Sequence, residues 1–162
     1  MGRKWFLLLI VVVLVLVGFQ TIVKAGEISL TKEEEGTIEK YLKQEVIEPN
    51  FGGEIFTAYE VLASNEKLGE IYVWALISEY YIEDKVIESG TSMSVPLVLH
   101  VNDSERGLEI LSYTMPGDGS YYEKDIKKLF PNRIHSKIFN YSSVHINKLM
   151  KEMDEKVENW KS

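Results

Sequence analysis

Gly69-Glu70-Ile71-Tyr72-Val73-Trp74-Ala75-Leu76-Ile77-Ser78-Glu79-Tyr80-Tyr81 is the stretch of this 162-residue chain that decides its fold. Both sets of alternating positions are apolar, which predicts a central β-strand covered on its two faces. One set holds Ile71, Val73, Ala75 and Ile77, and the other holds Tyr72, Trp74 and Leu76. Glu54–Ala63 has a similar content of Ile, Phe, Tyr and Val, and Asn65-Glu66-Lys67 separates the two runs. We therefore expect a β-hairpin.

Two further strands are expected after this hairpin. Glu83-Asp84-Lys85 predicts a turn, and residues 93 to 101 then alternate between apolar and polar side chains. Because Pro96 has no N–H to donate to a ladder, this strand lies at a sheet edge or carries a bulge there. After a turn near Gly107, residues 108 to 114 read as the last strand. The sheet is predicted to be an antiparallel meander of about four strands.

Helical patterns flank the predicted strands. Thr31 and Glu34 fit a capping box, and apolar residues follow at helical spacing, which predicts a helix over residues 32 to 46. After the turn Pro116-Gly117-Asp118-Gly119, Ser120 and Glu123 suggest a second capping box. A short helix near residues 134 to 138 and a long one carrying an apolar stripe from residue 146 to 160 complete the chain. The expected fold is α+β, with the C-terminal helices packed on one sheet face and a membrane segment at the N-terminus.

The first 25 residues predict export. Arg3 and Lys4 precede an uncharged run from Trp5 to Val23, which as a helix would span roughly 28 Å, about the thickness of the bilayer hydrocarbon. The run reads either as a cleaved signal peptide, with cleavage near Ala25, or as a single transmembrane anchor. The basic N-terminus favours a C-terminal domain outside the membrane. Residues 26–162 are then a single extracytoplasmic domain, tethered to the cell membrane or secreted.

Composition narrows the possible partners. The chain has no cysteine, so disulfides, thiolate metal sites and a cysteine-linked lipid anchor are excluded. Without Arg3, Lys4 and Lys24, 15 of the 18 basic residues remain against 25 acidic ones, so residues 26–162 carry a charge of about −10. Nucleic acid and anionic lipid surfaces are therefore poor partners. We expect no cofactor.

One motif suggests an enzyme. Gly90-Thr91-Ser92-Met93-Ser94-Val95-Pro96 is similar to the segment around the nucleophilic serine of subtilisin-family proteases. In that family the serine begins a buried helix and depends on a histidine and an aspartate that precede it in the chain. Here an alternating strand pattern follows Ser92, and all three histidines, His100, His135 and His145, lie downstream. A small envelope hydrolase that uses carboxylates or Ser92 is the alternative hypothesis. The histidines have no spacing that indicates a metal site.

Aromatic side chains suggest recognition instead. Tyrosines crowd the predicted sheet and the turn after it, and each offers an apolar ring with a polar tip. The surface that we predict to bind a protein or cell-envelope component is the turn and helix start at Asp118, Tyr121 and Tyr122. Ordinary core packing is the other explanation for these rings.

Three segments carry a resemblance to known proteins. They are Tyr72-Val73-Trp74-Ala75, Pro116-Gly117-Asp118-Gly119-Ser120-Tyr121-Tyr122 and Asp125-Ile126-Lys127-Lys128-Leu129-Phe130-Pro131. Together they resemble small extracytoplasmic domains of Gram-positive bacteria, some of which are C-terminal to multi-span sensor proteases of the antibiotic-response type. The resemblance covers roughly residues 54 to 131. This chain lacks the zinc motif and the several spans of those proteases. Protease activity is therefore not carried over, and the resemblance implies an exported accessory or sensing domain. Because the sequence offers no coherent catalytic set, the leading hypothesis is a non-enzymatic binding or accessory module of the cell envelope.

Overall fold

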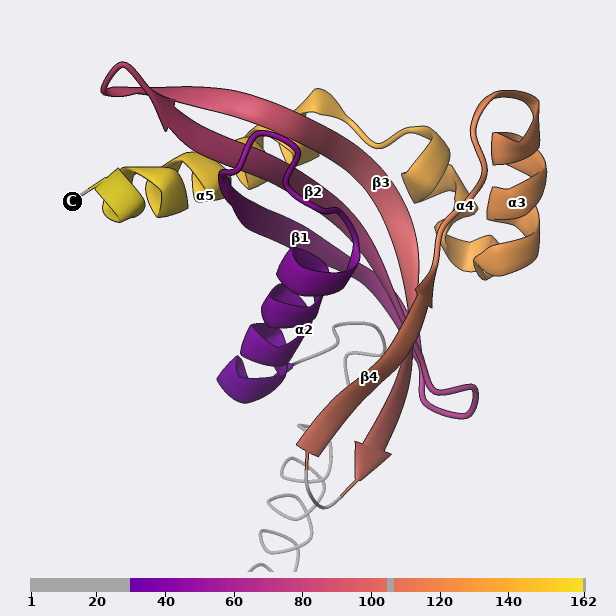
Figure 1. The fold of residues 1–162 in the computed structure, drawn as a ribbon. Coiled ribbons are helices and arrows are strands. Elements are labelled where there is room, and N and C mark those ends of the chain that lie inside the picture. Colours follow the sequence, from indigo (N-terminus) through magenta and orange to yellow (C-terminus); the bar gives the residue numbers. More distant parts are fainter. Residues whose placement is uncertain (1–29, 105–106, 162) are drawn as a thin grey trace, which may run out of the picture.

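The computed structural model describes residues 30–104 and 107–161. Within these residues, one helix precedes a four-stranded antiparallel sheet of order β1-β2-β3-β4, and three helices follow it (Figure 1). The α+β class and the four-stranded meander are therefore confirmed. The elements are α2 (Lys32–Glu45), β1 (Glu54–Asn65), β2 (Glu70–Glu83), β3 (Val86–Ser104), β4 (Gly107–Thr114), the 3-10 turn η2 (Gly119–Tyr121), α3 (Tyr122–Leu129), α4 (Asn132–Phe139) and α5 (Ser143–Lys161).

β2 is an interior strand that is covered on both faces, as its apolar pattern predicts. It pairs with β1 on one side and with β3 on the other. The β2–β3 hairpin turns at Asp84 and Lys85, which both adopt positive φ, at 49° and 67°. Two consecutive left-handed residues match a type I′ turn, whose twist suits the flanking strands.

The helix α2 covers one face of the sheet, here called the α2 face. Ile38 and Leu42 of α2 are fully buried against apolar side chains of β2 and β3. The predicted capping box at its start is confirmed, because Thr31 Oγ1 accepts the Glu34 N–H at 3.3 Å and the Glu34 carboxylate accepts the Thr31 N–H at 2.6 Å. Burying both side chains fully contributes roughly 1.5–3 kcal/mol each, which fixes α2 across the sheet.

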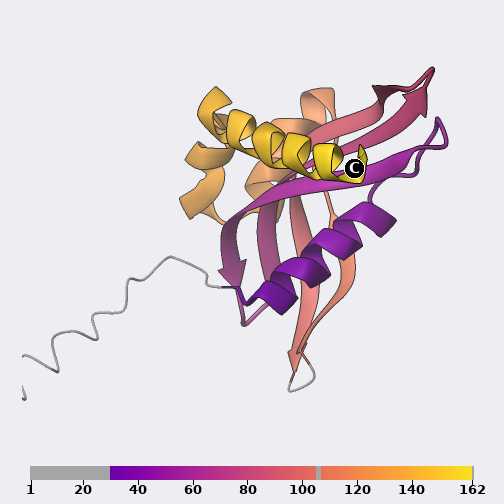
Figure 2. The same cartoon turned by 90° about the vertical axis from the view of Figure 1, so that its left-hand side faces the viewer.

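The C-terminal helices cover the opposite face, here called the α5 face. Their buried side chains are Ile126, Phe130, Ile134, Ile138, Leu149, Met153 and Val157. These pack on Tyr72 and Trp74 of β2 and on Val98 of β3. Figure 2 shows α2 and α5 on either side of β1. The sheet is thus the middle layer between α2 and the C-terminal helices, which explains why both faces of β2 are apolar.

Pro96 lies at a local edge of the sheet. It pairs with Trp74 of β2, whereas the pairing between β3 and β4 begins only at Val98 and Thr114. β4 is shorter than β3, so none of the described strands pairs with Pro96 on its outer side. Of the two positions predicted from the missing N–H of Pro96, a sheet edge or a bulge, the structure has the sheet edge.

The second predicted capping box is wrong. Ser120 lies inside η2, and the N-cap of α3 is Tyr121, whose side chain makes no capping hydrogen bond. Gly119 has a φ of 63°, which lets the chain enter a tight 3-10 turn before the helix begins. The Asp125 carboxylate instead ties the turn to α3 by accepting the Gly117 N–H at 2.9 Å.

The predicted leader, residues 1–25, lies outside the described residues. Among the helices that the structure does describe, none is both long and apolar enough to cross a membrane. Signal peptide and anchor therefore both stay predictions.

Candidate binding site

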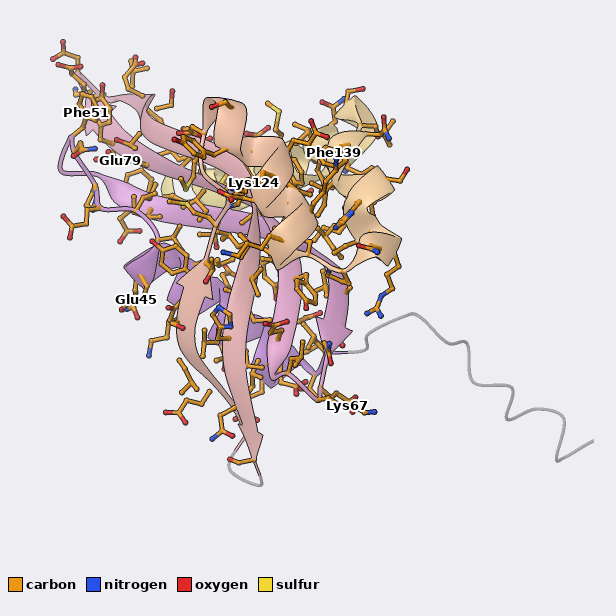
Figure 3. The ribbon with its side chains drawn as sticks, turned by 90° about the vertical axis from the view of Figure 1, so that its right-hand side faces the viewer. Glu45, Phe51, Lys67, Glu79, Lys124 and Phe139 are labelled. Carbon is orange, nitrogen blue, oxygen red and sulfur yellow. The ribbon has the colours of Figure 1, made fainter. Side chains whose placement is uncertain are left out.

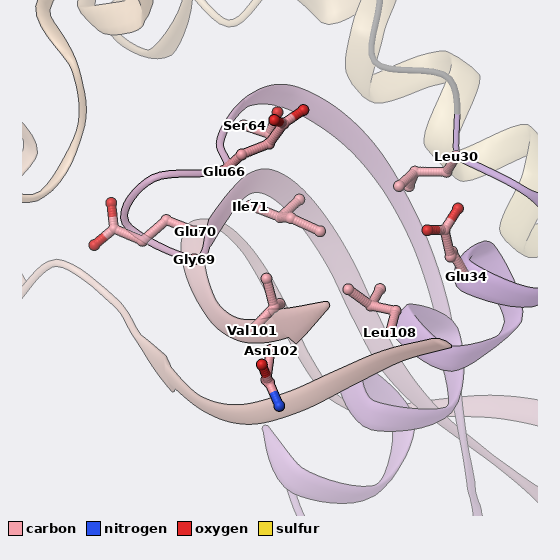
Figure 4. Close-up of a pocket in the computed structure, with 10 residues that line it drawn as sticks. All are labelled: Leu30, Glu34, Ser64, Glu66, Gly69, Glu70, Ile71, Val101, Asn102 and Leu108. Carbon is pink, nitrogen blue, oxygen red and sulfur yellow. The ribbon is translucent and has the colours of Figure 1, made fainter. Parts of the chain in front are cut away.

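The larger of two neighbouring concavities lies at the end of the sheet next to the start of α2. We call it the basal groove, and its volume is about 570 Å³. Figure 4 shows Ile71, Val101 and Leu108 between Glu34 on one side and Glu66 and Glu70 on the other. The remaining lining residues are Leu30, Ser64, Gly69 and Asn102. The groove thus combines an apolar floor with an acidic rim.

The apolar floor is the uncovered end of the α2-face core. Ile71 is buried there, while Leu30, Val101 and Leu108 are only partly buried. Gly69 shapes this end of the sheet, since its φ is 62° and its carbonyl accepts the Val101 N–H at 2.7 Å. A Cβ at Gly69 would lie 2.5 Å from the Val101 carbonyl oxygen, so only glycine permits this approach of β2 to β3.

The rim is negatively charged. Glu34 is held by the capping box, and its hydrogen bonds with Thr31 lower the pKa of its carboxyl. Glu70 accepts a hydrogen bond from the Tyr72 hydroxyl, and burial together with this carboxylate raises the pKa of Tyr72 to about 12. No lysine, arginine or histidine is among the described residues that line the groove. Glu70 Oε1 also lies 3.9 Å from His100 Nδ1, outside the groove lining. The groove thus places carboxylates beside an apolar surface.

A second concavity of about 360 Å³ lies beside the basal groove and shares Leu30 with it. We call it the β1 notch. It is lined by Glu35, Glu39, Tyr59, Glu60, Val61, Lys148 and Glu152, from α2, β1 and α5. The Tyr59 hydroxyl donates to the Glu35 carbonyl oxygen at 3.2 Å. Burial, and then the negative charges of the glutamates at 35, 39 and 152, raises the pKa of Tyr59.

A network of polar side chains is centred on Glu60 of β1. Its carboxylate accepts hydrogen bonds from Lys137 Nζ at 2.8 Å, Tyr141 Oη at 2.8 Å and His145 Nδ1 at 2.9 Å. Partial burial opposes ionisation of Glu60, but these donors outweigh it and lower the pKa of its carboxyl. The Tyr141 ring stacks on Trp74, with centroids 3.9 Å apart and planes 4° apart. The network therefore fastens the α4–α5 junction to the sheet.

Glu79, near the end of β2 that is remote from the basal groove, also holds a neighbouring segment on the sheet (Figure 3). Its side chain is buried, and its carboxylate accepts four backbone N–H groups, those of Asn50 at 2.9 Å, Phe51 at 2.8 Å, Gly53 at 2.9 Å and Thr91 at 3.4 Å. Burial alone would raise the pKa of Glu79, but the four amides outweigh it and lower the pKa. Glu79 thereby anchors the loop between α2 and β1, and neither concavity is lined by it.

The three residues that the sequence predicted as a binding surface lie together at the start of α3. Asp118 is the N-cap of η2 without a side-chain capping bond. Tyr121 is 66% exposed, whereas Tyr122 packs against the α5-face core and burial raises its pKa. None of the three lines the basal groove or the β1 notch. Asp118 and Tyr121 thus form a separate exposed surface, to which Tyr122 contributes only partly.

Ser92 lies on β3 with its side chain exposed, opposite Ser78 of β2. Within the described part of the chain, no hydrogen bond links Ser92 to a histidine or a carboxylate. The three histidines bond elsewhere, with His100 on Thr114, His135 on the Phe130 carbonyl and His145 on Glu60. Across residues 30–104 and 107–161, no group of His, Asp and Glu is arranged to hold a metal ion.

No protein-family model, curated protein or solved structure matches this chain. The resemblance to Gram-positive extracytoplasmic domains therefore stays a prediction. Sequence reasoning missed both concavities. The sequence held one indication of the basal groove. Val101 and Leu108 are apolar residues near the turn between two predicted strands, and the turn of the first hairpin carries glutamates. Their meeting with the start of α2 could not be inferred from spacing alone.

Proposed function

We propose that this chain is a non-enzymatic, extracytoplasmic binding module of the cell envelope. Its ligand is a segment of a protein partner that carries basic and apolar side chains, and the basal groove receives it. The predicted export leader, with Arg3 and Lys4 before the run Trp5–Val23, supports the location. The acidic composition supports a positively charged partner.

The observation that carries this proposal is the acidic rim around an apolar floor. An apolar side chain of Leu or Ile size that is buried on Ile71, Val101 and Leu108 would contribute roughly 1.5–3 kcal/mol. A lysine or arginine at the rim would add about 0.2–1 kcal/mol for each ion pair, since the rim is open to water. Together these terms give weak, salt-sensitive binding, which suits a sensing or accessory role.

Binding can be tested directly with a fluorescent six-residue peptide of alternating lysine and isoleucine, measured by anisotropy. A peptide of alternating glutamate and isoleucine is the matched control. We expect the lysine peptide to bind and the glutamate peptide not to bind. Leu108→Asn should weaken binding of the lysine peptide by about tenfold or more, because the floor loses an apolar contact without gaining a charge. Leu111→Asn is the control variant, since Leu111 is an exposed leucine of the same strand outside the groove. Equal binding of the two peptides would refute the proposal.

The location needs its own experiment. The tagged chain would be expressed in a Gram-positive host, fractionated and weighed by intact mass spectrometry. Protein in the medium with a mass that begins at Gly26 would establish secretion, and full-length protein in the membrane, cleaved by protease added outside, would establish a tether. Protein found only in the cytoplasm would contradict an extracytoplasmic role.

A further inference from the structure

The outer edge of β1 is an open strand edge that is only partly protected. β1 is the first strand of the sheet and pairs only with β2 in the described chain (Figure 2). Two cations protect its backbone, because Lys156 Nζ donates to the Thr57 carbonyl at 2.7 Å and Arg133 donates to the Ser64 carbonyl at 2.8 Å. Between these two points, Tyr59–Val61 line the β1 notch. An edge of this kind can accept an added strand.

We infer that the partner's segment extends beyond the basal groove, passes Leu30 and pairs as an added strand with β1 at Tyr59–Val61. This inference rests on the proposed function, because the same segment fills both concavities. Leu30 lines the basal groove and the β1 notch, so the two form one continuous surface around the start of α2. Backbone hydrogen bonds to the edge would supply affinity, and the side chains beside it would supply selectivity.

The notch is lined by four glutamates against one lysine, Lys148, so its charge favours a basic segment as well. Glu39 and Glu152 are already paired with Lys156, at 2.8 and 3.1 Å. The Glu35 carboxylate, by contrast, makes no hydrogen bond or ion pair within the described residues and lies exposed at the notch. It is thus the group that would meet a lysine or arginine of the added strand. A second copy of this acidic chain, with its net charge of −7, fits less well.

The test compares two probes on the full chain in zwitterionic detergent. The short probe is the six-residue lysine–isoleucine peptide, and the long probe continues it with six residues of alternating lysine and valine. We expect the long probe to bind at least about tenfold more tightly, because its second half binds intramolecularly. Hydrogen exchange should slow at the amides of Tyr59–Val61 with the long probe only. The free β3 edge at Ser92–Val95 serves as the internal control.

Charge-reversal variants separate the two halves of the surface. Glu35→Lys should weaken the long probe by about threefold to tenfold and leave the short probe unchanged, whereas Glu66→Lys should weaken both. Glu83→Lys, at the distant hairpin, should affect neither. Equal affinity of both probes without protection at Tyr59–Val61 would overturn the added strand while the groove proposal survives. Failure of both probes to bind would overturn both proposals. The long probe can also be tested on a variant that lacks residues 26–29. If it protects the amides of Tyr59–Val61 in that variant alone, the occupant of the β1 edge is this chain's own N-terminal segment, and the proposal of a partner strand is overturned.

Discussion

Tyr141→Phe tests whether the Glu60 network holds the C-terminal helices on the sheet. The substitution removes one hydroxyl, which donates to Glu60 Oε2 at 2.8 Å. It leaves the aromatic ring, and therefore the stack on Trp74 at 3.9 Å, in place. Lys137 and His145 continue to donate to Glu60, so the carboxylate keeps two of its three partners. The change therefore isolates one charge-assisted hydrogen bond.

The expected loss follows from the burial of the carboxylate. A hydrogen bond to a charged group contributes roughly 1.5–3 kcal/mol, and the side chain of Glu60 is 22% exposed, so water recovers part of this. We expect Tyr141→Phe to lower the free energy of unfolding by about 1–2 kcal/mol, or roughly 3–6 °C in Tm for a domain of this size. Tyr141→Leu should lose about 0.5–1.5 kcal/mol more, because the stack on Trp74 is lost too.

Urea denaturation at neutral pH measures both variants, together with Glu60→Gln and the double variant Glu60→Gln/Tyr141→Phe. The double-mutant cycle should give a coupling of about 1 kcal/mol between Glu60 and Tyr141, since the two groups are in contact. A free energy for Tyr141→Phe within about 0.3 kcal/mol of the original chain, or a coupling near zero, would refute the reasoning. The hydrogen bond from the Tyr141 hydroxyl to Glu60 would then be no more favourable than its hydrogen bond to water in the unfolded chain.

Three further outcomes are expected from stability measurements. Gly90→Ala should lower Tm, because its Cβ would lie 2.7 Å from the Glu79 carboxylate. Gly36→Ala, which has open space in the exposed middle of α2, should instead raise the free energy of unfolding by about 0.5–1 kcal/mol. Equal shifts in Tm for the two variants would contradict the crowding at Gly90. Glu60 and Glu79 have pKa values lowered by the fold, so their stabilisation is complete above the unfolded pKa of about 4.3 and is lost as pH falls through the folded pKa. The urea midpoint should therefore drop from pH 5 to pH 3, and Glu60→Gln should flatten that slope. Thr57→Val should raise stability by up to about 1 kcal/mol, since the buried Thr57 hydroxyl has no partner in the described structure; a loss in calorimetry would indicate an unseen partner.

Much of the fold could be predicted from local patterns. The double-sided apolar run of β2 predicted an interior strand, and the two-layer burial of Tyr72 and Val73 on opposite faces is its direct result. The capping box at Thr31 is also local, because the two groups it joins are three residues apart. The capping box predicted at Ser120 and Glu123, by contrast, does not form. A capping motif competes with other donors and acceptors, and Asp125 and Gly119 decided where α3 begins.

By itself, then, the sequence determined the class of fold, the order of its elements and the net negative charge of the chain, because periodicity, capping and composition act over a few residues or over the whole chain. Only the tertiary structure decided which side chains meet. Glu60 and His145 are 85 positions apart, Glu79 binds amides of a loop up to 29 positions away, and Leu30 meets Leu108 across the basal groove. Such meetings depend on how α2 and the C-terminal helices cover the sheet and on how far they leave its end bare. Packing sets that coverage, and packing is a property of all the elements at once.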